Sequence, residues 1–291
     1  SVTIWVVNAY QLAITISLLS FSSLGDIYGY RRIYLSGIAV FSVTSLICAL
    51  SDSFWTLTAA RIMQGFGAAA ITSVNTALLR IIYPKKFLGR GMGINALVVA
   101  VSIAAGPTIA SAILSLGSWH WLFAINVPFG IAALVIGISH LPGNPVKVYG
   151  RRFDKVSCLM NALTFGLLIF SLEGIAHKQS VVLVIGGIVA LGIIGYFFVR
   201  RQLRQRFPLL PVDLMRIPIF SLSIGTSISS FTAQMLAMIS LPFFLQNTLG
   251  RSDVATGLLL TPWPLATMIM APTAGRLVEK IHPGILGGIG M

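Results

Sequence analysis

Charge is scarce in this chain, because Asp, Glu, Lys and Arg together make up only 9% of its 291 residues. Hydrophobic residues make up 56%, and the mean hydropathy is +0.91, whereas soluble domains contain about 45–50% apolar residues. One soluble core cannot enclose so many apolar side chains. The composition therefore excludes a soluble globular domain and indicates a protein that resides in a bilayer.

Cysteine is almost absent, and both thiols, Cys48 and Cys158, lie in apolar surroundings. Two such residues cannot form a disulfide framework. The topology derived below places Cys48 near the outer face and Cys158 near the inner face, so we expect them not to pair.

Motifs for catalysis are also lacking. The sequence contains no Walker motif, nucleophile elbow, paired carboxylates or metal-ligand cluster, which disfavours an ATP-driven pump, a membrane enzyme or a receptor. The four histidines fall at the ends of predicted helices and not at metal-ligand spacing: His120, His140, His177 and His282. We expect no enzymatic activity, no catalytic residue, no cofactor and no bound metal.

Long apolar runs are what the chain has in abundance. A run of about 18 or more apolar residues is long enough to form a spanning helix. The sequence predicts an all-α membrane protein with nine such helices, and a tenth begins near Gly284. The nine cover residues 3–24, 33–51, 54–82, 91–116, 121–141, 157–175, 180–200, 217–246 and 253–273.

The formal net charge of +13 comes from basic residues that are confined to alternate loops. The opposite loops contain only Lys178 and Arg251, and Arg61 falls within a predicted helix; the rest of the 20 basic residues lie in loops on one side. The positive-inside rule therefore places those loops in the cytoplasm and Ser1 outside. Nucleic-acid binding would require a basic soluble face, so we do not expect it.

The basic segment 201–216 allows two interpretations. Its arginines could bind nucleic acid or anionic lipid, or the segment could be an amphipathic connector on the inner leaflet with its arginines near lipid phosphates. We favour the connector.

One aspartate and two arginines are crowded into "SSLGDIYGYRR" at residues 22–32, directly after a long apolar run. We expect a cytoplasmic loop of about eight residues here, in which Gly25 and Gly29 permit a tight turn and close helix approach. Asp26 could accept hydrogen bonds from arginines or from a helix N-terminus. An ordinary positive-inside turn is the alternative.

A similar segment, "GRLVEKIHPGI", follows a later apolar helix at residues 275–285. Leu24 corresponds to Leu277 and Asp26 to Glu279. A motif that recurs at this distance indicates two similar halves, which is the usual construction of secondary transporters.

The pattern small-x-Leu-x-Asp-x-x-Gly-x-Arg-Arg at residues 22–32 resembles the loop signature of the major facilitator superfamily. The resemblance implies a cytoplasmic gate motif formed by Leu24, Gly25, Asp26, Gly29, Arg31 and Arg32, with a second copy at Gly275, Leu277 and Glu279. In that family the signature follows the second helix of each half. We therefore expect one helix to be missing upstream of Ser1, where the sequence also shows no signal peptide, and most of the second half to be missing downstream.

Two central helices are left over when the halves are aligned, as in the fourteen-helix drug:proton antiporters. The resemblance thus implies five parts. They are residues 1–141, a six-helix half without its first helix; 142–156, a cytoplasmic linker; 157–200, an inserted helix pair; 201–216, a basic connector; and 217–291, the start of the second half.

The segment "LTAARIMQGFGAAA", residues 57–70, is similar to the helix-four signature of the same family at every position. An arginine inside a spanning helix costs about 2.5–3.5 kcal/mol on insertion scales, so Arg61 should face a polar cavity or partner. Gln64 lies at i+3 on the same face. A snorkelling arginine is the alternative, because Arg61 is only about two turns from the outer end. The resemblance implies that Arg61 and Gln64 take part in proton coupling.

The segment "SIAAGPTIAS", residues 102–111, is similar to the family's antiporter signature in helix five. Gly106 and Pro107 match, whereas Ser102, Ala110 and Ser111 replace flanking glycines. These residues are still small, so close packing and a local bend are retained. A kink without a role in the direction of transport is the alternative.

Several polar side chains fall at membrane depth and could line a cavity or form interhelical hydrogen bonds. They are Asn8, Tyr10, Gln11, Asn75, Asn126 and Gln234. Glu173, near the outer end of its helix, could bind a cation, but its place in the central pair favours an interfacial role.

The resemblance implies a proton-coupled exporter of lipophilic or cationic drugs that works by alternating access in the bacterial inner membrane. We expect its partners to be a small-molecule substrate, protons and the lipid bilayer, and we expect a monomer. The alternatives are an antiporter of a specific metabolite or other solute and a membrane protein that does not transport.

Overall fold

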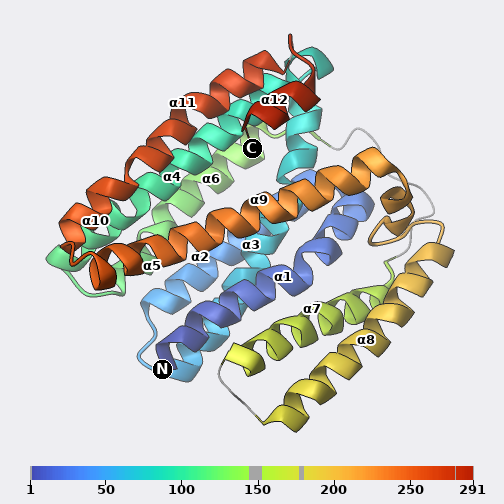
Figure 1. The fold of residues 1–291 in the computed structure, drawn as a ribbon, viewed down its shortest axis with the longest axis horizontal. Helices are drawn as coiled ribbons and strands as arrows, with labels where there is room; N and C mark the ends of the chain where they lie inside the picture. The colour runs from blue at the N-terminus through green and yellow to red at the C-terminus, as the bar shows by residue number, and fades with distance from the viewer. Residues whose placement is uncertain (1, 144–152, 177–179, 279, 291) are drawn as a thin grey trace. The chain divides into compact units, whose positions relative to one another are not determined.

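The computed structural model describes residues 2–143, 153–176, 180–278 and 280–290, and every regular element in these ranges is a helix (Figure 1). Eight of the helices are long and apolar enough to cross a membrane. The prediction of an all-α membrane protein is therefore confirmed. Several residues named above lie outside the described ranges: Ser1, residues 144–152 of the predicted linker, His177, Lys178 and Glu279.

The first eight predicted helices all occur, and most boundaries differ by a few residues. They are α1 (Val2–Tyr28), α2 (Tyr30–Ala49), α3 (Phe54–Ile82), α4 (Leu88–Leu116), α5 with α6 (Trp121–Ala124 and Asn126–His140), α7 (Lys155–Ala176), α8 (Val181–Arg204) and α9 (Pro218–Phe243). Three short helices accompany them. The helix η1 (Lys85–Phe87) precedes α4, and η2 (Val212–Arg216) precedes α9. The helix η3 (Phe244–Thr248) extends α9.

The ninth predicted helix is divided into α10 (Asp253–Leu260) and α11 (Pro262–Leu277). Thr261 between them keeps a helical backbone, with φ −58° and ψ −35°. The division arises because Pro262 and Pro264 have no N–H group to donate to the preceding turn. The last helix, α12, covers Pro283–Gly290.

The chain forms two compact units. The first runs to Ile81 and resumes from Leu116 to Val212, so it contains α1, α2, nearly all of α3, and α5 to α8. The second covers Ile82–Ser115 and Asp213–Met291, so it contains α4 and α9 to α12. These compact units are not the two transporter halves predicted from the sequence, and the division into halves stays a prediction.

Within the first unit, small residues bring three helices into close contact. A Cβ atom on Gly65 of α3 would lie 2.7 Å from the carbonyl oxygen of Tyr10 in α1. A Cβ atom on Gly67 would lie 2.8 Å from the backbone nitrogen of Phe41 and 3.0 Å from the carbonyl oxygen of Gly37, both in α2. In lipid, such backbone contact supplies the packing that drives helix association. The middle of α3 is consequently buried between α1 and α2.

The central helix pair also packs within the first unit, where α7 contacts both α8 and α1. Asn161 of α7 is fully buried and donates to the carbonyl oxygen of Ile16 in α1 at 2.9 Å. Near the other end of α7, Asn8 of α1 donates to Glu173 at 3.1 Å. These two bonds attach the central pair to α1 at two depths.

In the second unit, α4 and α11 meet at glycines. A Cβ atom on Gly275 would lie 2.7 Å from the carbonyl oxygen of Gly89 and 3.0 Å from the Cα atom of Gly93. A mainly apolar pocket of about 330 Å³ is lined by residues of α4, α9 and α11. Gln234 of α9 lies in its wall, together with Met238, Trp263 and Thr267.

Candidate functional site

The motif at residues 22–32 is helical and not a loop. The helix α1 continues to Tyr28 and α2 begins at Tyr30, so Gly29 alone separates them. The expectation of a loop of about eight residues is therefore wrong. The physical reason is Gly29, whose φ of 104° lies where only glycine is unstrained, so one residue suffices to reverse the chain.

The side chains of this motif connect the ends of several helices. The Tyr30 hydroxyl donates to Asp26 at 2.5 Å, and the Arg31 guanidinium donates to the carbonyl oxygen of Ile138 in α6 at 2.5 Å. A Cβ atom on Gly25 would lie 2.8 Å from the Val74 side chain of α3. Leu24 is half-buried and Arg32 is exposed. The motif thus holds α1, α2, α3 and α6 together at one end of the first unit.

Arg61 of α3 is the start of a polar chain at membrane depth. Its Nη1 donates to Gln64 Oε1 at 2.6 Å, and Gln64 Nε2 donates to Ser45 Oγ of α2 at 2.6 Å. The Ser45 hydroxyl in turn donates to the carbonyl oxygen of Phe41 at 2.7 Å. Gln64 is 1% exposed and Ser45 is fully buried. Because Gln64 accepts from Arg61 through Oε1 and donates to Ser45 through Nε2, the orientation of its amide is fixed, and the amide holds the guanidinium in place.

Aromatic rings occupy the other side of the Arg61 guanidinium. Its Cζ lies 3.9 Å from the ring centre of Tyr10 in α1 and 5.6 Å from that of Phe123 in α5. The close α1–α3 approach at Gly65 places Tyr10 there. Cation–π contacts of this kind stabilise a partly desolvated guanidinium. Among the described residues, however, Arg61 has no carboxylate partner.

The predicted cavity residues fall into different environments. Asn8 binds Glu173, whereas Asn126 donates to Leu122 of the same helical run at 3.3 Å. Gln11 is exposed and Asn75 is half-buried. Of the six, Tyr10 contacts Arg61 and Gln234 lines a pocket of the second unit.

The two glycine motifs of the second unit differ in packing. Among the described residues, no atom beyond the adjoining part of α4 lies within 4 Å of a Cβ built on Gly106, whereas Gly275 of α11 is in tight backbone contact. Leu277 ends α11 and is half-buried, and Glu279 lies outside the described residues. The roles inferred for Pro107 and for these residues stay predictions.

Two contributors to the Arg61 site, Ser45 and Phe123, could not be recognised from the sequence, because they are ordinary residues of apolar helices and no local pattern marks them. Outside this site, Glu173 was visible as a rare acid in a spanning helix, but its contact with Asn8 joins residues 165 positions apart. In the described part of the chain, no group of His, Cys, Asp and Glu residues could hold a metal ion.

Known relatives of the chain are transport proteins. It is 64% identical over 289 residues to the uncharacterized transporter YebQ of Escherichia coli (strain K12), and the match covers 99% of this chain and 63% of YebQ. It is 30% identical over 276 residues to the riboflavin transporter RibZ of Clostridioides difficile (strain 630), and the match covers 95% of this chain and 59% of RibZ. It is 32% identical over 289 residues to the tetracenomycin C resistance and export protein of Streptomyces glaucescens, and the match covers 96% of this chain and 52% of that protein.

The chain thus spans between about half and two thirds of the length of these relatives. The family model of the Major Facilitator Superfamily matches residues 1–291. Together with eight membrane-length helices in the described ranges, this match means that the chain belongs to the Major Facilitator Superfamily.

Proposed function

We propose that the protein is a secondary active transporter that exports lipophilic or cationic compounds in exchange for protons, by alternating access. The family membership and the relative named for tetracenomycin C export support this proposal. So do the motifs at Arg61 and at Gly106 and Pro107. The relative from Escherichia coli supports a place in a bacterial inner membrane.

One observation carries the proposed mechanism: the Arg61 guanidinium is held rigidly at membrane depth and has no carboxylate partner in the described residues. An arginine does not give up its proton at physiological pH, so Arg61 does not carry the transported proton. Its role would be electrostatic. It would favour the ionised form of a carboxylate brought near it during the transport cycle, and that carboxylate would bind a proton and a cationic substrate alternately.

Transport of a specific metabolite is the second candidate, and the riboflavin transporter at 30% identity favours it. The full-length protein in inside-out membrane vesicles distinguishes the two. With the lumen acidified, addition of a lipophilic cation such as ethidium should release lumenal protons and accumulate the cation. Proton release by riboflavin alone, with no response to any cationic drug, would favour the metabolite transporter. Substrate accumulation that is independent of the pH gradient would contradict proton coupling.

The proposed topology places the 50–53 turn outside and the 83–87 turn in the cytoplasm, because basic residues are segregated to alternate loops. Both turns contain exposed positions, Ser53 and Lys85. In a full-length variant without Cys48 and Cys158, Ser53→Cys should react with a membrane-impermeant maleimide in intact cells. Lys85→Cys should react only after the cells are opened. The reverse pattern of labelling would overturn the orientation.

A further inference from the structure

A polar network closes one end of the α7–α8 hairpin. Asp154, just before α7, accepts hydrogen bonds from the backbone N–H groups of Val156 and Ser157, both at 3.1 Å. Arg201 of α8 donates to both oxygens of Asp154 at 3.1 Å, and Gln205 also donates to this carboxylate. Partial burial acts to raise the pKa of Asp154, but the hydrogen bonds from Gln205, Ser157 and Arg201 outweigh it and hold that pKa well below its usual range. The charge of Arg201 is therefore neutralised locally.

Two further arginines of α8 are not neutralised in this way. Arg200 and Arg204 are exposed, and because they are four residues apart they lie on one face of the helix. Within the ranges that the structure describes, neither has a hydrogen-bond or ion-pair partner. Guanidinium groups bind oxyanions such as phosphate in a bidentate manner. This face therefore offers two unused groups for an anion.

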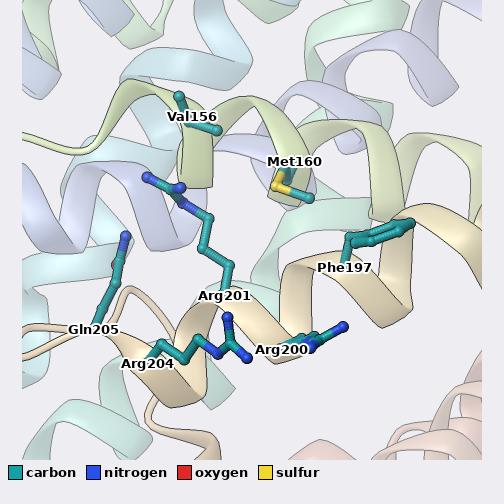
Figure 2. A pocket seen from close by; sticks show the side chains of 7 residues that line it. All are labelled: Val156, Met160, Phe197, Arg200, Arg201, Arg204 and Gln205. Carbon is teal, nitrogen blue, oxygen red and sulfur yellow. The ribbon is translucent and has the colours of Figure 1, made fainter.

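A pocket of about 610 Å³ lies between α7 and α8 beside these arginines (Figure 2). Figure 2 shows Arg201 extending from α8 toward α7, whereas Arg200 and Arg204 stay along α8. Met160 from α7 and Phe197 from α8 complete the apolar part of the wall.

The polar and apolar parts of this pocket are separated along the hairpin. Phe197 lies about one turn before Arg200 and two turns before Arg204 in α8, and Met160 lies about one turn beyond Val156 in α7. Because α7 and α8 run in opposite directions, both apolar residues lie deeper in the spanning part: Phe197 is roughly 5–10 Å deeper than the two arginines, and Met160 is roughly 6 Å deeper than Val156. Phe197 is 52% exposed and Val156 is 51% exposed, so the apolar wall is open to the bilayer. The pocket is cationic at the membrane surface and apolar below it.

We propose that this pocket binds one anionic phospholipid. Arg200 and Arg204 hold its phosphate, and an acyl chain lies along Phe197 and Met160. A free phosphate would use the arginines but would leave the apolar wall uncovered, so the depth profile favours the lipid. The Asp154–Arg201 pair keeps the two helices together beneath the headgroup. This proposal does not depend on which substrate is carried.

The test uses the full-length protein, purified in a mild detergent and titrated with phosphatidylglycerol, with bound lipid counted by native mass spectrometry. Replacement of both arginines, Arg200→Gln with Arg204→Gln, should weaken binding of the first phosphatidylglycerol about 30-fold, since each basic residue near an anionic lipid surface contributes about 1 kcal/mol. Arg200→Lys with Arg204→Lys keeps the charge and should retain part of the affinity. Arg206→Gln with Arg216→Gln removes the same charge at exposed positions outside the pocket and should leave the affinity unchanged.

Competition identifies the ligand. Neither inorganic phosphate nor glycerophosphoglycerol, which has the headgroup without acyl chains, should displace the lipid. Displacement by either compound would mean that the pocket is a site for a soluble anion and would overturn the proposal. Equal losses in the 200/204 and 206/216 variants would also overturn it, because binding would then reflect diffuse charge. So would equal affinity for phosphatidylcholine.

Discussion

Replacing Arg61 with alanine is expected to reduce proton-driven efflux roughly 30-fold or more, because the proposed cycle pairs Arg61 with a carboxylate and removing one partner of a buried charge pair costs about 2–5 kcal/mol. Arg61→Lys keeps the positive charge but loses the planar fork that bonds Gln64 Oε1 and stacks on Tyr10. It should retain partial activity. The measurement is ethidium efflux under an imposed pH gradient, in cells with equal amounts of the full-length protein in the membrane.

The matched control for this prediction is Arg80→Ala. Arg80 lies in the last turn of the same helix and is exposed, so its removal changes the charge of α3 without touching the Gln64–Ser45 chain. Efflux should be close to the parent rate. If Arg61→Ala instead transported at the parent rate with the parent pH dependence, Arg61 would have only a structural role.

The second large effect is expected from Gly67→Leu in α3. A Cβ atom at this position would lie 2.8 Å from the backbone nitrogen of Phe41 and 3.0 Å from the carbonyl oxygen of Gly37. Backbone atoms cannot move aside as a side chain can, so α2 and α3 must separate. Overpacking commonly costs about 1–3 kcal/mol, and a clash with backbone belongs at or above the upper end of that range. We expect the melting temperature, measured by fluorescence-detected size-exclusion chromatography in mild detergent, to fall steeply.

Gly192→Leu provides the comparison for this variant, because Gly192 lies in α8 and no atom of another described element lies within 4 Å of its Cβ position. It adds the same side chain to a spanning helix without a clash. Its melting temperature should stay near that of the parent. A Gly67→Leu protein as stable as the Gly192→Leu protein would show that the α2–α3 contact is not tight in the membrane.

The spanning helices could be predicted well because their signal is additive. Each apolar residue favours the bilayer by itself, so a run such as 54–82 identifies α3 (Phe54–Ile82) without reference to any other part of the chain. Helix ends are harder to predict, because one or two residues can decide where a helix stops. Gly29 turns the chain alone, and Pro262 with Pro264 divides an apolar run that otherwise has sufficient length.

Part of the Arg61 site was also visible in the sequence. The i+3 spacing predicts that Gln64 shares a face with Arg61, and the 2.6 Å bond between them confirms this contact. The proposed role of the pair in proton coupling remains to be tested by the variants above. Ser45 and Tyr10 could not be assigned to the site, because they reach it only through contacts between helices.

The sequence by itself determined that this chain crosses a membrane repeatedly, roughly where each helix runs, and which family it resembles. These properties depend on residue types and on spacings within one helix. Only the tertiary structure decided that α7 packs on α1 through Asn161, that Gln64 bonds Ser45, and that an amphipathic pocket forms beside Arg200 and Arg204. The reason is physical: all the helices are similarly apolar, so the hydrophobic effect does not choose between neighbours in lipid. The choice depends on where small residues allow backbones to approach and where polar groups meet across the contact.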